Sequence, residues 1–169
     1  MRFKLLVSDI DGVWTDGSFY YNENGDALRK FSTKDSFGVS LAAIQQIPIL
    51  IISGEQNKMV LSRMQKLGLP NFKLGVRNKL QTLLDFCEQQ GVLLSEVAYL
   101  GDDMNDYNLL GKVGMFVCPL DAYKRIKEKA DKTLTTKGGE GAFREFVEYI
   151  LEKEEVLEIA YKKYININE

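Results

Sequence analysis

The sequence of 169 residues contains no histidine. Without an imidazole there is no Ser-His-Asp or Cys-His catalytic pair, no histidine-ligated zinc and no histidine general base. The chain has only 2 cysteines, Cys87 and Cys118, which are far apart and form no C-x-x-C motif. Neither a disulfide framework nor a thiolate zinc site is expected. Any catalysis must therefore use carboxylates, lysine, hydroxyl groups or a metal ion that prefers oxygen ligands.

The chain also lacks long apolar runs and an excess of basic residues. No stretch approaches the roughly 18–20 consecutive apolar residues of a membrane span, and no signal-peptide core precedes the first expected strand. The 22 basic and 24 acidic residues are spread along the chain, so there is no basic stripe for nucleic acid. With 45% apolar residues, we expect one cytoplasmic domain over residues 1–169, with neither nucleic acid nor a membrane as partner.

What is present is an alternation of short apolar runs and longer amphipathic segments. Continuous apolar runs predict strands buried on both faces at residues 3–8, 47–53, 97–101 and 114–118. Helical periodicity predicts helices at residues 36–46, 56–67, 78–90, 104–110 and 121–129. This alternation indicates an α/β fold with a doubly wound, Rossmann-like parallel sheet and helices on both faces.

Two segments depart from this alternation. Residues 17–32 contain aromatic runs on both sides of Asn24-Gly25, which predicts a β-hairpin inserted after the first strand. Residues 137–169 begin with a glycine-rich link and continue as a helical, charged tail.

Polar residues follow several of the predicted strands. Ligands of open α/β sheets bind beyond the carboxyl ends of the strands, and those positions hold Asp9, Asp11, Ser53, Gly54, Asp102 and Asp103, while Lys79 begins a helix. Alternate residues of an extended segment point to the same side, so Asp9 and Asp11 can face one pocket. Crowded carboxylates repel one another unless a cation lies between them, and oxygen ligands favour magnesium.

A phosphorylated substrate suits such a site, because magnesium is usually held by one or two carboxylates together with phosphate oxygens. Ser53, the backbone N–H groups at Gly54 and Lys79 are expected to bind the phosphate, which leaves Asp9 able to attack phosphorus. A signalling receiver domain is the other doubly wound alternative, but it requires an acceptor aspartate where Ser53 stands.

These segments resemble the motifs of the haloacid dehalogenase superfamily of phosphatases: "DIDGVWTDG", "IISGE", Lys79 and "GDDMND", in the family's order. The resemblance implies that Asp9 forms an aspartyl-phosphate, and that Asp11 protonates the leaving alcohol and then activates water. It implies that Asp9, the Asp11 main-chain carbonyl and Asp102 hold magnesium, and that Ser53 and Lys79 bind the phosphoryl group. Asp103 and Asp106 would orient these groups from outside.

The intervals between the motifs have no room for a cap domain, since residues 11–53 accommodate only the hairpin and one helix. An uncapped site is open to water, so we expect another subunit to close it, with the aromatic hairpin as lid or contact surface. The tail "GGEGAFREFVEYIL" is similar to that of small tetrameric phosphatases of sugar acids, in which the glycine-rich segment reaches a neighbour's active site. The resemblance implies a homotetramer that acts on a phosphorylated sugar acid.

Glu55 bears on the substrate. The octulosonate 8-phosphate branch of that group resembles S-G-R at the second motif, whereas this chain has Ser53-Gly54-Glu55. An arginine would pair with a sugar-acid carboxylate, whereas a glutamate accepts hydrogen bonds from hydroxyls. This favours a nonulosonate 9-phosphate such as deaminoneuraminate or N-acetylneuraminate 9-phosphate. The alternatives are 3-deoxy-D-manno-octulosonate 8-phosphate and a catalytically idle assembly domain of the same fold. Arg144 or Lys137 from an adjoining subunit is the candidate partner of the substrate carboxylate.

Overall fold

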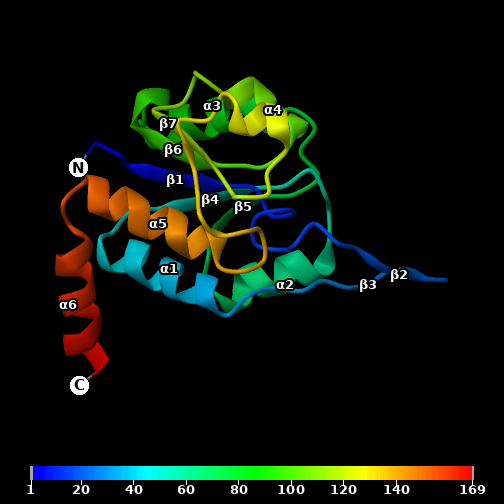
Figure 1. The fold of residues 1–169 in the computed structure, drawn as a ribbon, viewed down its shortest axis with the longest axis horizontal. Coiled ribbons are helices and arrows are strands. Elements are labelled where there is room, and N and C mark those ends of the chain that lie inside the picture. The colour runs from blue at the N-terminus through cyan, green and yellow to red at the C-terminus, as the bar shows by residue number, and fades with distance from the viewer. Residues whose placement is uncertain (1, 169) are drawn as a thin grey trace.

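The computed structural model describes residues 2–168, and its centre is a parallel sheet of six strands in the order β5-β4-β1-β6-β7-β8 (Figure 1). β1 (Leu5–Ser8) pairs with β4 (Ile49–Ile52) on one side and with β6 (Val97–Leu100) on the other. β5 (Asn71–Lys73) lies beyond β4, and β7 (Met115–Cys118) and β8 (Lys132–Thr133) lie beyond β6. The predicted doubly wound fold is confirmed. β5 and β8 escaped prediction because such short edge strands carry no continuous apolar run.

Helices cover both faces of the sheet. α1 (Lys34–Ile44), α2 (Lys58–Lys66) and α5 (Ala142–Lys153) share a core cluster with Leu6 of β1. α3 (Lys79–Gln90), α4 (Lys124–Lys127) and the 3₁₀ helix η2 (Met104–Leu109) share the opposite cluster with Leu5 and Val7. A further 3₁₀ turn, η1 (Leu94–Glu96), leads into β6. Because successive strand residues point to opposite faces, burial on both faces explains the continuous apolar runs.

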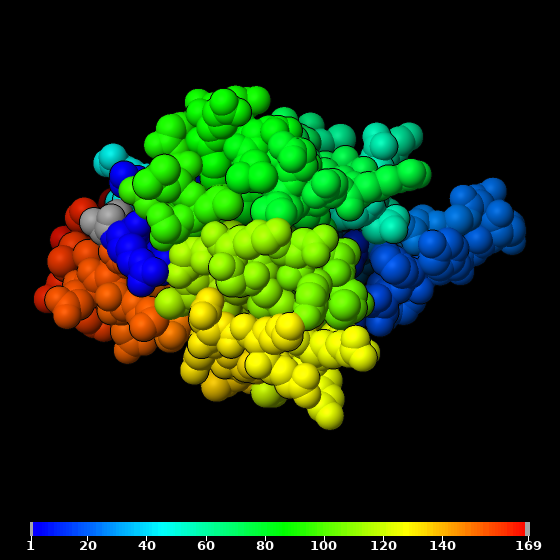
Figure 2. Space-filling model, turned by 90° about the horizontal axis from the view of Figure 1, so that it is seen from above, coloured from blue at the N-terminus to red at the C-terminus, as the bar shows by residue number. Residues whose placement is uncertain are grey.

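The hairpin consists of β2 (Tyr20–Asn22) and β3 (Gly25–Leu28), paired antiparallel. Gly25 follows the turn with a φ of 106°, a backbone conformation that suits glycine. Figures 1 and 2 show the hairpin projecting from the body of the molecule, and Tyr20, Tyr21 and Leu28 expose their side chains there. Within residues 2–168, the hairpin and α1 are the only elements between β1 and β4, and no cap domain is inserted.

The tail forms two helices, α5 and α6 (Leu157–Asn168), which are separated by a turn at Glu155. The glycine-rich segment before α5 packs on the loop that follows β1 in the same chain. The N–H of Gly139 donates to the Val13 carbonyl at 2.9 Å, and a Cβ added at Gly138 would lie 2.1 Å from the Gly12 carbonyl oxygen. Side chains would not fit at this contact. No helix among the described residues is long and apolar enough to cross a membrane.

Candidate active site

The carboxyl ends of β1, β4 and β6 surround a small pocket of about 260 Å³. Most of the polar residues expected at strand ends line it: Asp9, Asp11, Ser53, Gly54, Asp102 and Asp103. Glu55 and Asn105 also line it, and Phe19 contributes a wall from the base of the hairpin. The segments that the sequence places far apart therefore meet at one site.

Asp9 lies at the end of β1 and is 2% exposed. Its Oδ1 accepts the Ile10 backbone N–H at 2.7 Å, and its Oδ2 lies 2.6 Å from the Lys79 ammonium and 3.5 Å from the Asn105 amide nitrogen. Burial raises the pKa of Asp9 and the charge of Asp106 raises it further, while Lys79 opposes both effects. Asp9 therefore needs nearby positive charge to remain ionised at neutral pH.

Lys79 supplies part of that charge. It is the first residue of α3, its side chain is 1% exposed, and its Nζ also donates to Asp106 Oδ1 at 2.7 Å. Burial lowers the pKa of Lys79, but the attraction of Asp9 and Asp106 outweighs this and the net shift is upward. Lys79 is thus a buried ammonium held against Asp9, and its contact with phosphate stays a prediction.

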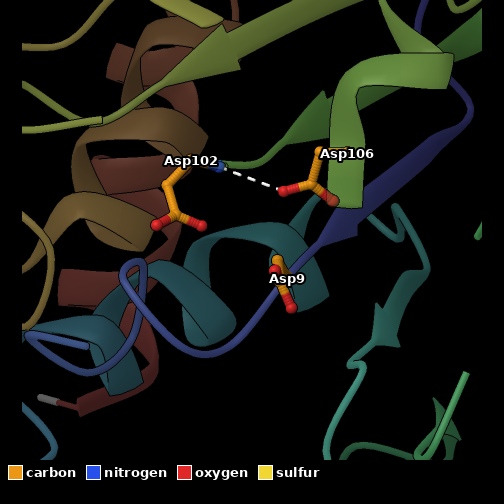
Figure 3. Close-up of side chains that lie close together, drawn as sticks. All are labelled: Asp9, Asp102 and Asp106. Carbon is orange, nitrogen blue, oxygen red and sulfur yellow. Dashed lines mark hydrogen bonds between the residues drawn. The ribbon is translucent and has the colours of Figure 1, made fainter. Parts of the chain in front are cut away.

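Asp106 is held by donors on both oxygens. Oδ1 accepts from Lys79 and from the Tyr99 hydroxyl, the latter at 2.6 Å, and Oδ2 accepts from the Asp102 backbone N–H at 3.1 Å. Figure 3 shows the contact between Asp106 and the Asp102 backbone. This geometry agrees with an orienting role for Asp106. In the sequence, Tyr99 is indistinguishable from a core residue because it lies within the apolar run of β6.

Asp102 completes a carboxylate cluster that fits a cation. Ligand oxygens of Asp9, Asp102 and Asp106 lie within 4.8 Å of one another (Figure 3). Asp102 Oδ1 is buried without a hydrogen-bond partner in residues 2–168, and burial, together with Asp9 and Asp106, raises the pKa of Asp102 to about 8. When all three carboxylates are ionised, they and the one ammonium leave two negative charges unbalanced, which a divalent cation would match. Asp9 and Asp102 line the pocket whereas Asp106 is not among its described lining residues, so the oxygens of Asp9 and Asp102 are the better placed ligands.

Asp11 faces the pocket from the turn after β1. Its Oδ1 accepts from Arg29 and, at 3.3 Å, from the Thr15 hydroxyl. Its Oδ2 is buried and has no hydrogen-bond partner within the part of the chain that the structure describes. Arg29 lies directly after β3 with no motif or periodic pattern around it, so nothing in the sequence marks it as a site residue.

The remaining predicted site residues have different surroundings. Ser53 is buried and its Oγ accepts the Glu55 backbone N–H at 3.2 Å, while Glu55 is exposed at the pocket rim. Asp103 is exposed and caps η2 by accepting the Met104 N–H at 2.7 Å, which is a structural reason for an acid at that position. Arg144 lies on α5, where its Nε donates to Glu148 at 2.7 Å, and it is not among the pocket's described lining residues.

Comparison with known proteins identifies the family. A sequence model of the haloacid dehalogenase-like hydrolases matches residues 72–146. The 3-deoxy-D-manno-octulosonate 8-phosphate phosphatase of Escherichia coli K12 is 35% identical over 150 residues, which cover 89% of this chain and 80% of the relative. The chain belongs to the haloacid dehalogenase-like hydrolases. Like its relatives in this family, it is a phosphoric monoester hydrolase.

Solved structures of the family are similar over nearly the whole chain. The octulosonate phosphatase of Moraxella catarrhalis, solved with magnesium, phosphate and the octulosonate, has a TM-score of 0.91 and 29% identity and covers 96% of this chain and 94% of its own. The cobalt-bound octulosonate phosphatase of Haemophilus influenzae has a TM-score of 0.88 and 33% identity, with 92% and 91% covered. These divalent ions confirm the predicted type of cofactor. The names of the relatives favour the octulosonate alternative over the nonulosonate predicted from Glu55.

Proposed function

We propose that this hydrolase acts on the phosphate ester of a 2-keto-3-deoxy sugar acid, with 3-deoxy-D-manno-octulosonate 8-phosphate as the leading candidate. The observation that carries the proposal is the convergence of Asp9, Asp102 and buried Lys79 beside one pocket. The named activity of the relatives supports this choice of substrate.

In the proposed mechanism, Asp9 Oδ attacks phosphorus as the bond from phosphorus to the sugar oxygen breaks. Asp11 gives a proton to that oxygen, so that the sugar leaves as a neutral alcohol. In the second step Asp11 takes a proton from water, the water oxygen bonds to phosphorus, and Asp9 is released. Lys79 holds Asp9 ionised, while Ser53 and the Gly54 backbone bind phosphoryl oxygens.

Asp9, the Asp11 main-chain carbonyl and Asp102 would hold magnesium. The bound ion supplies positive charge that stabilises negative charge on the phosphoryl oxygens. A chelator should stop phosphate release and added magnesium should restore it, whereas full activity in excess chelator would exclude the metal site.

Glu55 supports a second candidate, the nonulosonate 9-phosphates, because its carboxylate lines the pocket and can accept hydrogen bonds from the hydroxyls of a sugar. The test compares kcat/KM for octulosonate 8-phosphate and deaminoneuraminate 9-phosphate in the wild type and in Glu55→Arg. If Glu55 selects the nine-carbon sugar, the wild type prefers that substrate and the variant shifts toward the octulosonate. Equal ratios in the two proteins would remove Glu55 from the specificity argument.

We also propose that the active assembly is a homotetramer in which a neighbouring subunit closes the site. The exposed aromatic residues of the hairpin support this, as does the absence of lysine and arginine from the described pocket lining, since a sugar-acid carboxylate needs a cation. Lys137 or Arg144 of a neighbour is the proposed cation. Mixing Asp9→Asn subunits with Lys137→Ala or Arg144→Ala subunits should restore activity if either acts across the interface. An active monomer in sedimentation experiments would contradict the proposal.

A further inference from the structure

The base of the hairpin contains a buried cation that the proposed mechanism has not used. The Arg29 side chain is 0% exposed, and its guanidinium lies 3.9 Å from the centre of the Phe19 ring. One guanidinium nitrogen donates to Asp11 Oδ1 and the other to Asp26 Oδ2, the latter at 2.9 Å. Arg29 therefore bridges a carboxylate of the pocket to a carboxylate of the hairpin.

This bridge continues to α2. Asn57 donates to Asp26 Oδ2 at 2.7 Å, and its own Oδ1 caps α2 by accepting the Met59 N–H at 2.7 Å. α2 begins just after Ser53 and Gly54, so the contacts run from one side of the pocket, through the hairpin, to the other. The network fixes the hairpin relative to the pocket and places Phe19 in the pocket wall.

The contacts of Asp11 are asymmetric in a way that suits proton transfer. Arg29 and Thr15 hold Oδ1, whereas Oδ2 is buried beside the pocket without a partner among residues 2–168. A guanidinium presents its N–H groups in a rigid plane, so a carboxylate bound to it has a defined orientation. Arg29 thereby fixes the orientation of Asp11 and leaves Oδ2, which is buried in this conformation, as the oxygen without a hydrogen bond to the described chain.

We propose that Arg29 is a positioning residue for the proton transfer made by Asp11, and that hairpin docking brings it into place. The inference rests on the proposed role of Asp11 as acid and base. It assigns the hairpin a function inside its own subunit, through Asp11, in addition to any contact with another subunit.

A comparison of two substrates with different leaving groups separates the role of Arg29 from a general loss of structure, which would slow both substrates alike. A sugar alkoxide is a poor leaving group and needs the proton from Asp11 as its bond to phosphorus breaks, whereas p-nitrophenolate leaves without protonation. The value of kcat/KM reports steps up to the transfer of phosphorus to Asp9, so the later attack of water does not affect it. A misplaced Asp11 should therefore reduce kcat/KM for the sugar phosphate more than for the aryl phosphate.

The experiment measures kcat/KM for 3-deoxy-D-manno-octulosonate 8-phosphate and for p-nitrophenyl phosphate in wild type, Arg29→Gln, Arg29→Lys, Asp26→Asn and Asp11→Asn. We expect the ratio of kcat/KM for the sugar phosphate to kcat/KM for the aryl phosphate to fall at least about tenfold in Arg29→Gln. The ratio should fall in Asp11→Asn as well. Arg29→Lys keeps the charge without the planar fork and should give an intermediate ratio. Asp26→Asn weakens the contacts of the hairpin with Arg29 and Asn57, so its ratio should fall in the same direction as that of Arg29→Gln, but by less.

An unchanged ratio in Arg29→Gln, with both substrates slowed equally or not at all, would overturn the role of Arg29. If Arg29→Gln does not fold, an unchanged ratio in Arg29→Lys has the same meaning. Failure of the proposed function looks different: wild-type protein would not hydrolyse the sugar phosphate, or Asp9→Asn would retain aryl phosphatase activity.

Discussion

Asp9 and Asp11 are two residues apart, but different parts of the molecule hold them in place. Asp9 contacts Lys79 of α3 and the Asn105 side chain of η2, and both elements pack on the core of the sheet. Asp11 contacts Thr15 of its own loop and Arg29 of a hairpin that projects from the body. The position of the proposed nucleophile is thus part of the fold, while the position of the proposed acid depends on an element at the periphery.

This difference separates two kinds of perturbation. Changes around Asp9 alter buried charge, so they should affect both chemistry and stability. Changes around Asp11 alter the orientation of a half-buried carboxylate, so they should affect one proton transfer and leave most of the folding energy intact.

The first prediction concerns the nucleophile itself. Asp9→Asn preserves the shape of the side chain but removes the oxygen nucleophile, so phosphate release should fall by at least about 10³-fold. The variant should melt at a temperature equal to or above that of the wild type, because it removes one of the crowded buried carboxylates. Undiminished phosphate release would exclude Asp9 as nucleophile, whatever its surroundings.

The second prediction concerns the buried ammonium. Lys79→Met leaves Asp9 and Asp106 without their shared cation, and removal of one partner from a buried ion pair costs about 3–5 kcal/mol. Denaturant unfolding in chelator measures this loss, and magnesium should recover part of it by restoring positive charge to the cluster.

Lys58→Met is the matched control for Lys79→Met. Lys58 is also the first residue of a helix, but it is exposed, so its loss should change stability by less than about 0.5 kcal/mol. Equal effects of the two substitutions would show that Lys79 is not a buried counter-ion.

The contrast between the core around Asp9 and the peripheral hairpin around Asp11 also describes what could be predicted from the sequence. The sheet, most helices and the polar residues at strand ends follow from local patterns, and the structure places Asp106 against the Asp102 backbone. Arg29 was missed because its pairing with Asp11 depends on the docking angle of the hairpin, which no local pattern encodes. Asn105 was missed although it lies inside the quoted "GDDMND", since a neutral amide carries no charge argument.

The third prediction disturbs the loop of Asp11 from the tail side. A Cβ added at Gly139, whose φ is 71°, would lie 2.6 Å from the Asp16 backbone nitrogen. Gly139→Ala should therefore cost about 2–3 kcal/mol and lower kcat, because the displaced loop carries Asp11 and Thr15. Circular dichroism during thermal unfolding and steady-state kinetics measure the two effects.

Gly91→Ala isolates the backbone part of that effect. Gly91 has a similar φ of 65°, ends α3, and would place a Cβ with nothing within 4 Å among the described atoms. It should cost only about 1 kcal/mol and leave kcat unchanged. A Gly139→Ala variant that behaves like Gly91→Ala would show that the tail does not brace the loop.

The fourth and smallest prediction tests whether the contact between α1 and the start of α5 also holds the loop of Asp11 in place. Asp35 is buried, and its Oδ1 accepts the Arg144 N–H near the start of α5 at 3.1 Å. Burial raises the pKa of Asp35 to about 6, against the opposing hydrogen bond from Arg144. A raised carboxyl pKa contributes stability at a pH below the unfolded value near 4, and this contribution is lost as the pH rises through about 6.

Asp35→Asn keeps an oxygen acceptor for the Arg144 N–H but cannot ionise. Relative to the wild type, it should therefore gain about 1–2 kcal/mol of stability on going from pH 4.5 to pH 7.5, as measured by chemical denaturation. If kcat at pH 7.5 is unchanged in this variant, the loop of Asp11 is braced by the glycine contacts themselves. If kcat instead falls as far as it does in Gly139→Ala, the position of Asp11 depends on the contact between Asp35 and α5. The position of Asp11 would then depend on the core of the protein, as that of Asp9 does.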